Sequence, residues 1–105
     1  MCRQYFISGR VQGVWYRNFT QQRAAALGLE GWVRNLPDGR VEILACGAQA
    51  ALRSFELALW EGPEMAVVTQ VDATGVALPG KLQGFQILPL ASLHIAPAGL
   101  GRRRK

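Results

Sequence analysis

The sequence predicts an α+β fold in which two helices cover one face of an antiparallel sheet. Three observations favour this fold class. Pro37, Asp38 and Gly39 form a strong turn signal between two strand-like segments, which is typical of a β-hairpin. Residues 48–60 repeat apolar side chains at helical spacing. A glycine-bounded loop at residues 9–17 separates an apolar, strand-like segment from a helix-like one.

The first half of the chain is predicted to form a strand, a helix and the two strands of the hairpin. Residues 3–9 alternate well enough for a strand, and residues 17–27 form a helix that ends at Gly28. Polar residues interrupt the apolar stripe of this helix, so its flanking glycines support it more than its periodicity does. The hairpin strands are residues 30–36 and 40–46. The apolar side chains that share one face of the second hairpin strand are Val41, Ile43 and Ala45.

The second half is predicted to form a helix, a long strand and a short strand. The helix, residues 48–60, ends at Gly62 and Pro63. Its repeating apolar residues are Ala48, Leu52, Phe55 and Leu59. Residues 66–76 form the long strand and residues 84–88 the short one. The order is therefore β-α-β-β-α-β with a short extra C-terminal strand, which is the ferredoxin-like split β-α-β sandwich.

This topology brings two distant segments together. In a split β-α-β unit the first and second strands run parallel, and the third lies between them. The loop at residues 9–17 leaves the end of the first strand, and Asn35 lies near the end of the second. Both therefore reach the same edge of the sheet, about 10 Å apart. The Arg17 side chain and a phosphate-sized ligand are together long enough to bridge that gap.

The length of 105 residues predicts one domain, at residues 1–89, followed by a flexible basic tail at residues 90–105. No segment approaches the ~20 apolar residues that cross a membrane, and the N-terminus does not read as a signal segment. We expect a soluble, cytoplasmic monomer. Of the net charge of +5, the last four residues carry +4 and the other 101 only +1. This distribution favours a solvated basic terminus over a nucleic-acid-binding surface.

The two cysteines, Cys2 and Cys46, are too few and too far apart in sequence for a zinc site. A disulfide between them is compatible with the sequence, but a cytosolic chain favours two reduced thiols, and these are our expectation. Cys46 lies in an alternating strand, where it is expected to pack as a small hydrophobic residue.

The loop at residues 9–17 has the features of a phosphate-binding loop. Backbone N–H groups in a glycine-bounded turn between a strand and a helix form a concave anion site, and the helix N-terminus adds partial positive charge. Arg17, at the mouth of the loop, adds a planar guanidinium that binds phosphate through two hydrogen bonds.

Two segments resemble the signatures of the acylphosphatase family. Residues 7–17 read ISGRVQGVWYR, and they depart from the first signature only at Tyr16, where the family usually has Phe or Met. Residues 31–47 match the second signature, beginning GWVRNLPDGRV and ending at Gly47. The resemblance covers residues 3–88 and implies hydrolysis of acyl phosphates, the mixed anhydrides of a carboxylic acid and phosphate, to carboxylate and inorganic phosphate.

The resemblance also implies the roles of individual residues. Arg17 binds the phosphate and Asn35 holds the attacking water, so these two are the candidate catalytic residues. The backbone of the loop completes the phosphate site. Its phosphate-binding residues are Gln12, Gly13, Val14, Trp15, Tyr16 and Arg17. Tyr16 is expected to fill the core position of the usual Phe or Met, where its hydroxyl needs a partner. Trp15 either flanks the mouth of the site or covers the edge of the core.

We expect neither a metal nor a cofactor. The chain has no Asp/Glu pair with obvious ligand spacing, its one histidine, His94, lies in the predicted tail, and neither cysteine lies in the phosphate loop. Gly31, Gly39 and Gly47 are interpreted as structural. Broad acyl specificity is expected, because a loop that grips only phosphate accepts many acyl groups.

Three other functions are compatible with parts of the sequence. A nucleic-acid-binding module can share this fold, but such modules carry aromatic residues on two central strands, and residues 40–46 have none. A scaffold that has lost catalysis and binds a protein partner is disfavoured by the intact Arg17 and Asn35. A domain of a larger carbamoyl-transferring enzyme is disfavoured by the length of the chain.

Overall fold

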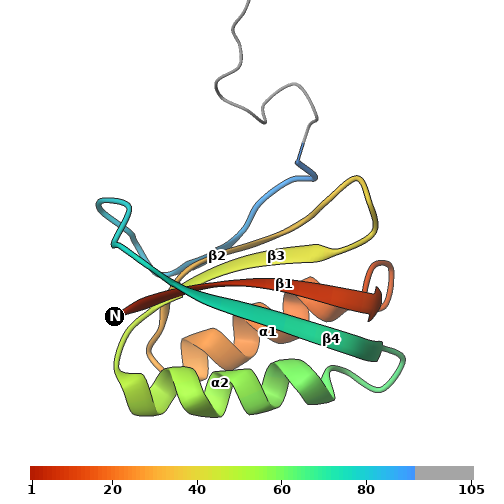
Figure 1. Cartoon of the computed structure of the whole chain (residues 1–105), viewed down its shortest axis with the longest axis horizontal. Coiled ribbons are helices and arrows are strands. Elements are labelled where there is room, and N and C mark those ends of the chain that lie inside the picture. The colour runs from red at the N-terminus through yellow and green to blue at the C-terminus, as the bar shows by residue number, and fades with distance from the viewer. Residues whose placement is uncertain (92–105) are drawn as a thin grey trace, which may run out of the picture.

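A computed structural model of the chain describes residues 1–91. In this part of the chain, one five-stranded sheet has the order β4-β1-β3-β2-β5, and two helices cover one of its faces (Figure 1). The strands are β1 (Cys2–Arg10), β2 (Glu30–Asn35), β3 (Val41–Cys46), β4 (Val67–Val76) and β5 (Phe85–Ile87). The helices are α1 (Tyr16–Ala26) and α2 (Gln49–Glu61). The predicted α+β, ferredoxin-like fold is therefore confirmed, with each element within about one residue of its expected bounds.

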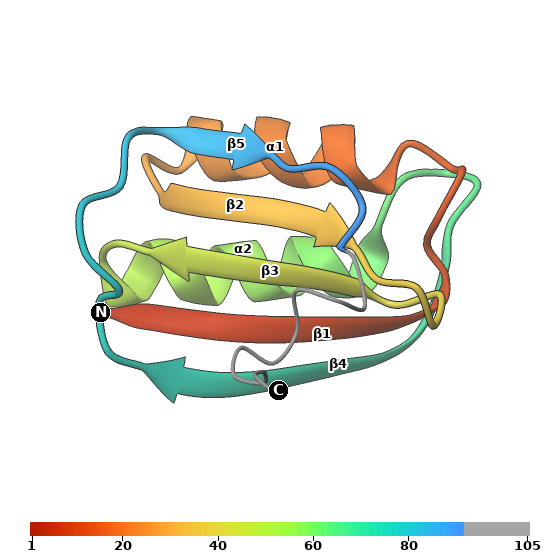
Figure 2. The ribbon, with the colours of Figure 1, turned by 90° about the horizontal axis from the view of Figure 1, so that it is seen from above.

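The register of the central strands confirms the predicted topology. β3 pairs antiparallel with both β1 and β2, so β1 and β2 run parallel on either side of it. Their ends lie at the same edge of the sheet, as Figure 2 shows. One expectation was wrong, because β5 pairs parallel with β2 and the sheet is not antiparallel throughout. After the edge strand β4, the chain passes to the opposite side of the sheet, where the other edge strand, β5, runs in the same direction as β2.

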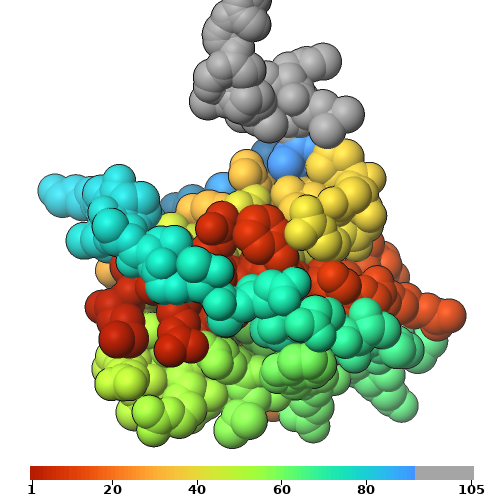
Figure 3. Space-filling model, viewed as in Figure 1, coloured from red at the N-terminus to blue at the C-terminus, as the bar shows by residue number. Residues whose placement is uncertain are grey.

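The hydrophobic core lies between the sheet and the two helices. The shared face of β3 is confirmed, since Val41, Ile43 and Ala45 are fully buried. α2 contributes Leu52, Phe55 and Leu59 to the core. In the space-filling view of Figure 3, the surface of α2 lies below that of β4. The buried residues of α1 are Tyr16, Thr20 and Ala24, spaced four apart. The apolar periodicity of this helix is weak because its buried stripe consists of a tyrosine, a threonine and an alanine, and not of large aliphatic residues.

Two glycines allow strands to approach closely. A Cβ at Gly9 would lie 2.0 Å from the carbonyl oxygen of Val67, and a Cβ at Gly31 would lie 1.9 Å from that of Leu44. Both glycines also have positive φ, +119° and +149°, which side chains rarely adopt. The structural interpretation of Gly31 is thus supported, and Gly9 allows a similar close approach of β1 to β4.

The cysteines correct a second expectation. Cys2 and Cys46 face each other in the β1–β3 pairing and are joined in a disulfide, so the prediction of two reduced thiols was wrong. The antiparallel register places side by side two residues that are 44 positions apart in the sequence. Both cysteines are buried, as expected for Cys46.

Residues 92–105 lie outside the described part of the chain. Most of the predicted tail, with His94, therefore has no structural description, whereas Leu90 and Ala91 do. Within residues 1–91, no helix is both long enough and apolar enough to cross a membrane.

Candidate active site

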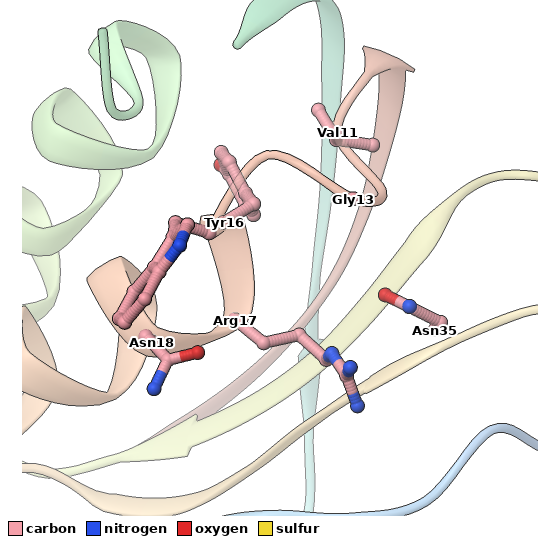
Figure 4. Close-up of a pocket in the computed structure, with 7 residues that line it drawn as sticks. Val11, Gly13, Tyr16, Arg17, Asn18 and Asn35 are labelled. Atoms are coloured by element: carbon pink, nitrogen blue, oxygen red, sulfur yellow. The ribbon is translucent and has the colours of Figure 1, made fainter. Parts of the chain in front are cut away.

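A cavity of about 260 Å³ opens at the edge of the sheet where β1 and β2 end. It is where the two signature segments meet, since one contributes the loop before α1 and the other contributes the end of β2 (Figure 4). The lining residues are Val11, Gly13, Trp15, Tyr16, Arg17, Asn18 and Asn35. Most of the predicted site residues are among them. Gln12 and Val14 are not, and Val11 and Asn18 are additions to the prediction.

The loop before α1 has the backbone of an anion-binding concavity. Gly13 has φ +74° and Trp15 has φ +69°, and Trp15 is the only non-glycine residue with positive φ in the described part of the chain. Val14 between them has the opposite sign of φ. Alternation of this kind turns successive N–H groups toward one side, where they bind an anion together.

The N-terminus of α1 is also free for an anion. No side chain of the described residues caps this helix, and its first turn contains no acidic residue. The first N–H groups of a helix have no partner within the helix, and they carry the positive end of its dipole. The chain therefore presents a cluster of donors, with partial positive charge, at the cavity that Arg17 lines.

Arg17 extends its guanidinium from the first turn of α1 toward Asn35 (Figure 4). Its Nη1 donates to the carbonyl oxygen of Leu88, just after β5, over 3.4 Å. The ion pairs formed within residues 1–91 are Arg3–Glu56, Arg34–Glu42 and Arg40–Asp38. Arg17 takes part in none of them. Its positive charge is therefore held in place by a neutral acceptor and is not neutralised by a carboxylate.

Asn35 lines the cavity and has an unpaired polar side-chain atom. Its side-chain Oδ1 is buried and accepts no hydrogen bond from any residue in the range 1–91. Its backbone is fixed, because it pairs with Val41 in β3 and its carbonyl oxygen accepts from the N–H of Ala91 at 3.0 Å. A buried acceptor without a partner costs about 1–3 kcal/mol. Such an atom suits a site where a water molecule or ligand donates to it.

The side chain of Gln12 makes a contact that was not predicted. Its Nε2 donates to the carbonyl oxygens of Leu36 and Arg40, both at 2.9 Å. The side chain therefore ties the phosphate loop to the hairpin that follows Asn35. Only the backbone of Gln12 remains for an anion. No sequence pattern indicates this contact, because backbone carbonyls have no sequence signature.

The two aromatic residues of the loop differ sharply in burial. Trp15 is 72% exposed and lines the cavity, so it flanks the mouth of the site and does not cover the core. Tyr16 is fully buried in the core, as expected. Its hydroxyl donates to the carbonyl oxygen of Leu59 at 2.7 Å, which supplies the partner that it needs. Burial raises the pKa of this phenol, so it stays neutral.

Among residues 1–91, no group of three or more His, Cys, Asp or Glu side chains is arranged to hold a metal ion. The donors at the cavity are N–H groups and a guanidinium, which bind anions. Asn18 and Asn35 add neutral amide groups to the lining.

The comparisons with known proteins agree with this geometry. The acylphosphatase family model matches residues 3–87. An acylphosphatase from Nitrosococcus oceani is 46% identical over 86 residues, which are 82% of this chain and 96% of that protein. One from Xanthomonas euvesicatoria pv. vesicatoria is 53% identical over 76 residues, 72% of this chain and 86% of that protein. The crystal structure of acylphosphatase from Bacillus subtilis matches with a TM-score of 0.79 and 42% identity, covering 84% of this chain and 99% of that one.

The family model spans most of the chain, the relatives are similar over nearly their whole length, and the solved structure has the same fold. The nucleic-acid and protein-binding alternatives receive no comparable support. The chain therefore belongs to the acylphosphatase family, and it is an enzyme of that kind, a hydrolase of acyl phosphates.

Proposed function

We propose that the cavity between the phosphate loop and the end of β2 is the site of acyl phosphate hydrolysis. One observation carries the assignment. One cavity of about 260 Å³ is lined by an arginine that pairs with no carboxylate of residues 1–91, by a loop of alternating φ, and by an asparagine whose buried side-chain oxygen has no partner among those residues. Arg17 and the loop N–H groups hold the phosphoryl group, and Asn35 holds the attacking water.

The chemistry of the substrate fits a site of this composition. A carboxyl–phosphate anhydride is already activated, and its carboxylate is a good leaving group. The remaining task is to align the water and to stabilise charge on the phosphoryl oxygens. The Arg17 fork matches two of those oxygens, and backbone donors suit the others.

Asn35 acts by orientation and not as a base. Its Oδ1 accepts a hydrogen bond from the water, which directs a lone pair of the water toward phosphorus. An amide cannot take the proton, so the proton passes to a phosphate oxygen of the substrate. The products are the carboxylate and inorganic phosphate.

The recognition groups are concentrated on the phosphate, which supports broad specificity for the acyl group. Residues 1–89 form the catalytic domain. They contain every residue described at this site except Ala91, whose N–H donates to the Asn35 carbonyl oxygen. The enzyme works as a monomer, without a metal, a cofactor or nucleic acid.

The proposal is tested by measuring hydrolysis of benzoyl phosphate with and without EDTA. Wild type should be active at both conditions, and Arg17→Ala should lose activity together with affinity for inorganic phosphate. The loss should be roughly 10²-fold or more, because the main charge on the phosphoryl group is removed.

Arg53→Ala is the matched control, since this exposed arginine lies on α2 outside the cavity. It should keep wild-type rates. Activity that disappears with EDTA, or that survives in Arg17→Ala, would contradict the proposed mechanism.

A further inference from the structure

Tyr16 joins the phosphate loop to the far end of α2 through a buried contact. Its side chain is 1% exposed, and its hydroxyl donates to the carbonyl oxygen of Leu59 at 2.7 Å. The ring lies close to Gly62, because a Cβ there would meet Tyr16 Cε1 at 3.2 Å. The backbone carbonyl of Tyr16 accepts from the Thr20 hydroxyl at 2.8 Å. Both ends of the residue are therefore fixed.

The acceptor of this hydrogen bond lacks a partner within its own helix. Leu59 lies in the last turn of α2, where carbonyls have no intrahelical donor. The N–H of Gly62 binds the carbonyl of Ala58, so it is not available to Leu59. The Tyr16 hydroxyl thus caps the negative end of the α2 dipole in a place that is closed to water. Without the hydroxyl, a buried carbonyl is left unpaired.

The hydrogen bond from Tyr16 to Leu59 is made by a residue that adjoins the phosphate loop. Tyr16 is the first residue of α1, and it lies between Trp15, whose φ is +69°, and Arg17. No side chain of the described residues caps the N-terminus of α1. A phenylalanine or methionine at position 16 would fill the core, but it could not donate to Leu59.

We propose that Tyr16 is a positioning residue, whose hydroxyl holds the phosphate loop and Arg17 in place by anchoring them to α2. This inference rests on the proposed function, since it concerns the same phosphate site. The hydroxyl touches no substrate. It acts by fixing the backbone of residues 15–17, and its effect falls on phosphate affinity.

The test compares Tyr16→Phe with Tyr5→Phe. Both tyrosines are fully buried, and both hydroxyls donate to α2, that of Tyr5 to Glu56 at 3.0 Å. Only Tyr16 borders the cavity. For each variant the dissociation constant of inorganic phosphate, KM and kcat for benzoyl phosphate, and Tm are measured, with binding assayed well below the lowest Tm.

Both variants should lose thermal stability, but only Tyr16→Phe should raise the phosphate dissociation constant and KM, by roughly 3- to 10-fold. Wild-type phosphate affinity and KM in Tyr16→Phe, at a Tm reduced like that of Tyr5→Phe, would leave the hydroxyl a merely structural role and overturn the inference. Equal loss of affinity in both variants would do the same. A wild-type protein that neither binds phosphate nor hydrolyses the substrate would instead refute the proposed function and, with it, this inference.

Discussion

Asn35 combines an unpaired side-chain oxygen with a firmly held backbone. Most buried side-chain oxygens in proteins accept a hydrogen bond, yet its Oδ1 accepts none from residues 1–91. The sheet compensates for that cost, because β2 and the N–H of Ala91 hold the backbone on both sides. Arg17 contrasts with it, since its guanidinium donates to the Leu88 carbonyl.

Asn35→Ala should lower kcat by ~10²–10³-fold, because a water that has lost its positioned acceptor seldom lies in line with the leaving group. The dissociation constant of inorganic phosphate should stay within about 2-fold of wild type, since Arg17 and the loop remain. Single-turnover kinetics and phosphate titration measure the two effects separately. If binding and turnover fell equally, Asn35 would be a phosphate ligand and the water-positioning role would be wrong.

The elements themselves follow from local sequence patterns, but their close approach depends on particular glycines. The predicted helix at residues 48–60 corresponds to α2 (Gln49–Glu61), and the predicted hairpin corresponds to β2 and β3. Periodicity and turn residues identify such elements. At Gly31, however, the strand approaches the carbonyl of Leu44 so closely that a side chain does not fit. Periodicity does not reveal this requirement.

Gly31→Ala should lower the free energy of unfolding by about 3 kcal/mol or more, because its Cβ overlaps the Leu44 carbonyl and φ is +149°. Gly75→Ala is the control. Gly75 lies in β4 with ordinary φ and with nothing within 4 Å of the added Cβ, so the change should be about 0.5 kcal/mol or less. Urea unfolding measures both variants. Equal stability of the two would show that the sheet opens easily at Gly31.

At the scale of the whole molecule, stability should depend on pH through two buried phenols. Burial, and for Tyr5 also the neighbouring Glu56, raises the pKa of Tyr5 and Tyr16 above the ordinary value of 10.0. The folded protein therefore keeps two protons at a pH where the unfolded chain releases them. Their contribution to stability is complete below about pH 10, and it is lost as the pH rises toward the higher pKa values of the folded state.

The free energy of unfolding contributed by these phenols should therefore be constant between about pH 6 and pH 9 and fall above about pH 10. Urea titrations at a series of pH values measure this decline. The double variant Tyr5→Phe, Tyr16→Phe should show a shallower alkaline decline, although it is less stable at neutral pH. An unchanged alkaline slope in that variant would assign the decline to other groups.

The sequence by itself determined the order of elements and predicted that Arg17 and Asn35 lie at the same end of the sheet, where they line one cavity. Alternation, helical spacing and turn residues are local properties, and the parallel course of β1 and β2 then places both strand ends at one edge. The core position of Tyr16 was expected from the resemblance to the family signature, and it is confirmed.

The tertiary structure alone decided the contacts that hold the site together. The side chain of Gln12 reaches a carbonyl 24 residues away, the hydroxyl of Tyr16 one 43 residues away, and Arg17 one 71 residues away. The disulfide of Cys2 with Cys46 and the parallel pairing of β5 also depend on strand register and chain path. The three hydrogen bonds are hidden from the sequence because every residue has a carbonyl oxygen, and only packing selects which carbonyl a distant donor meets.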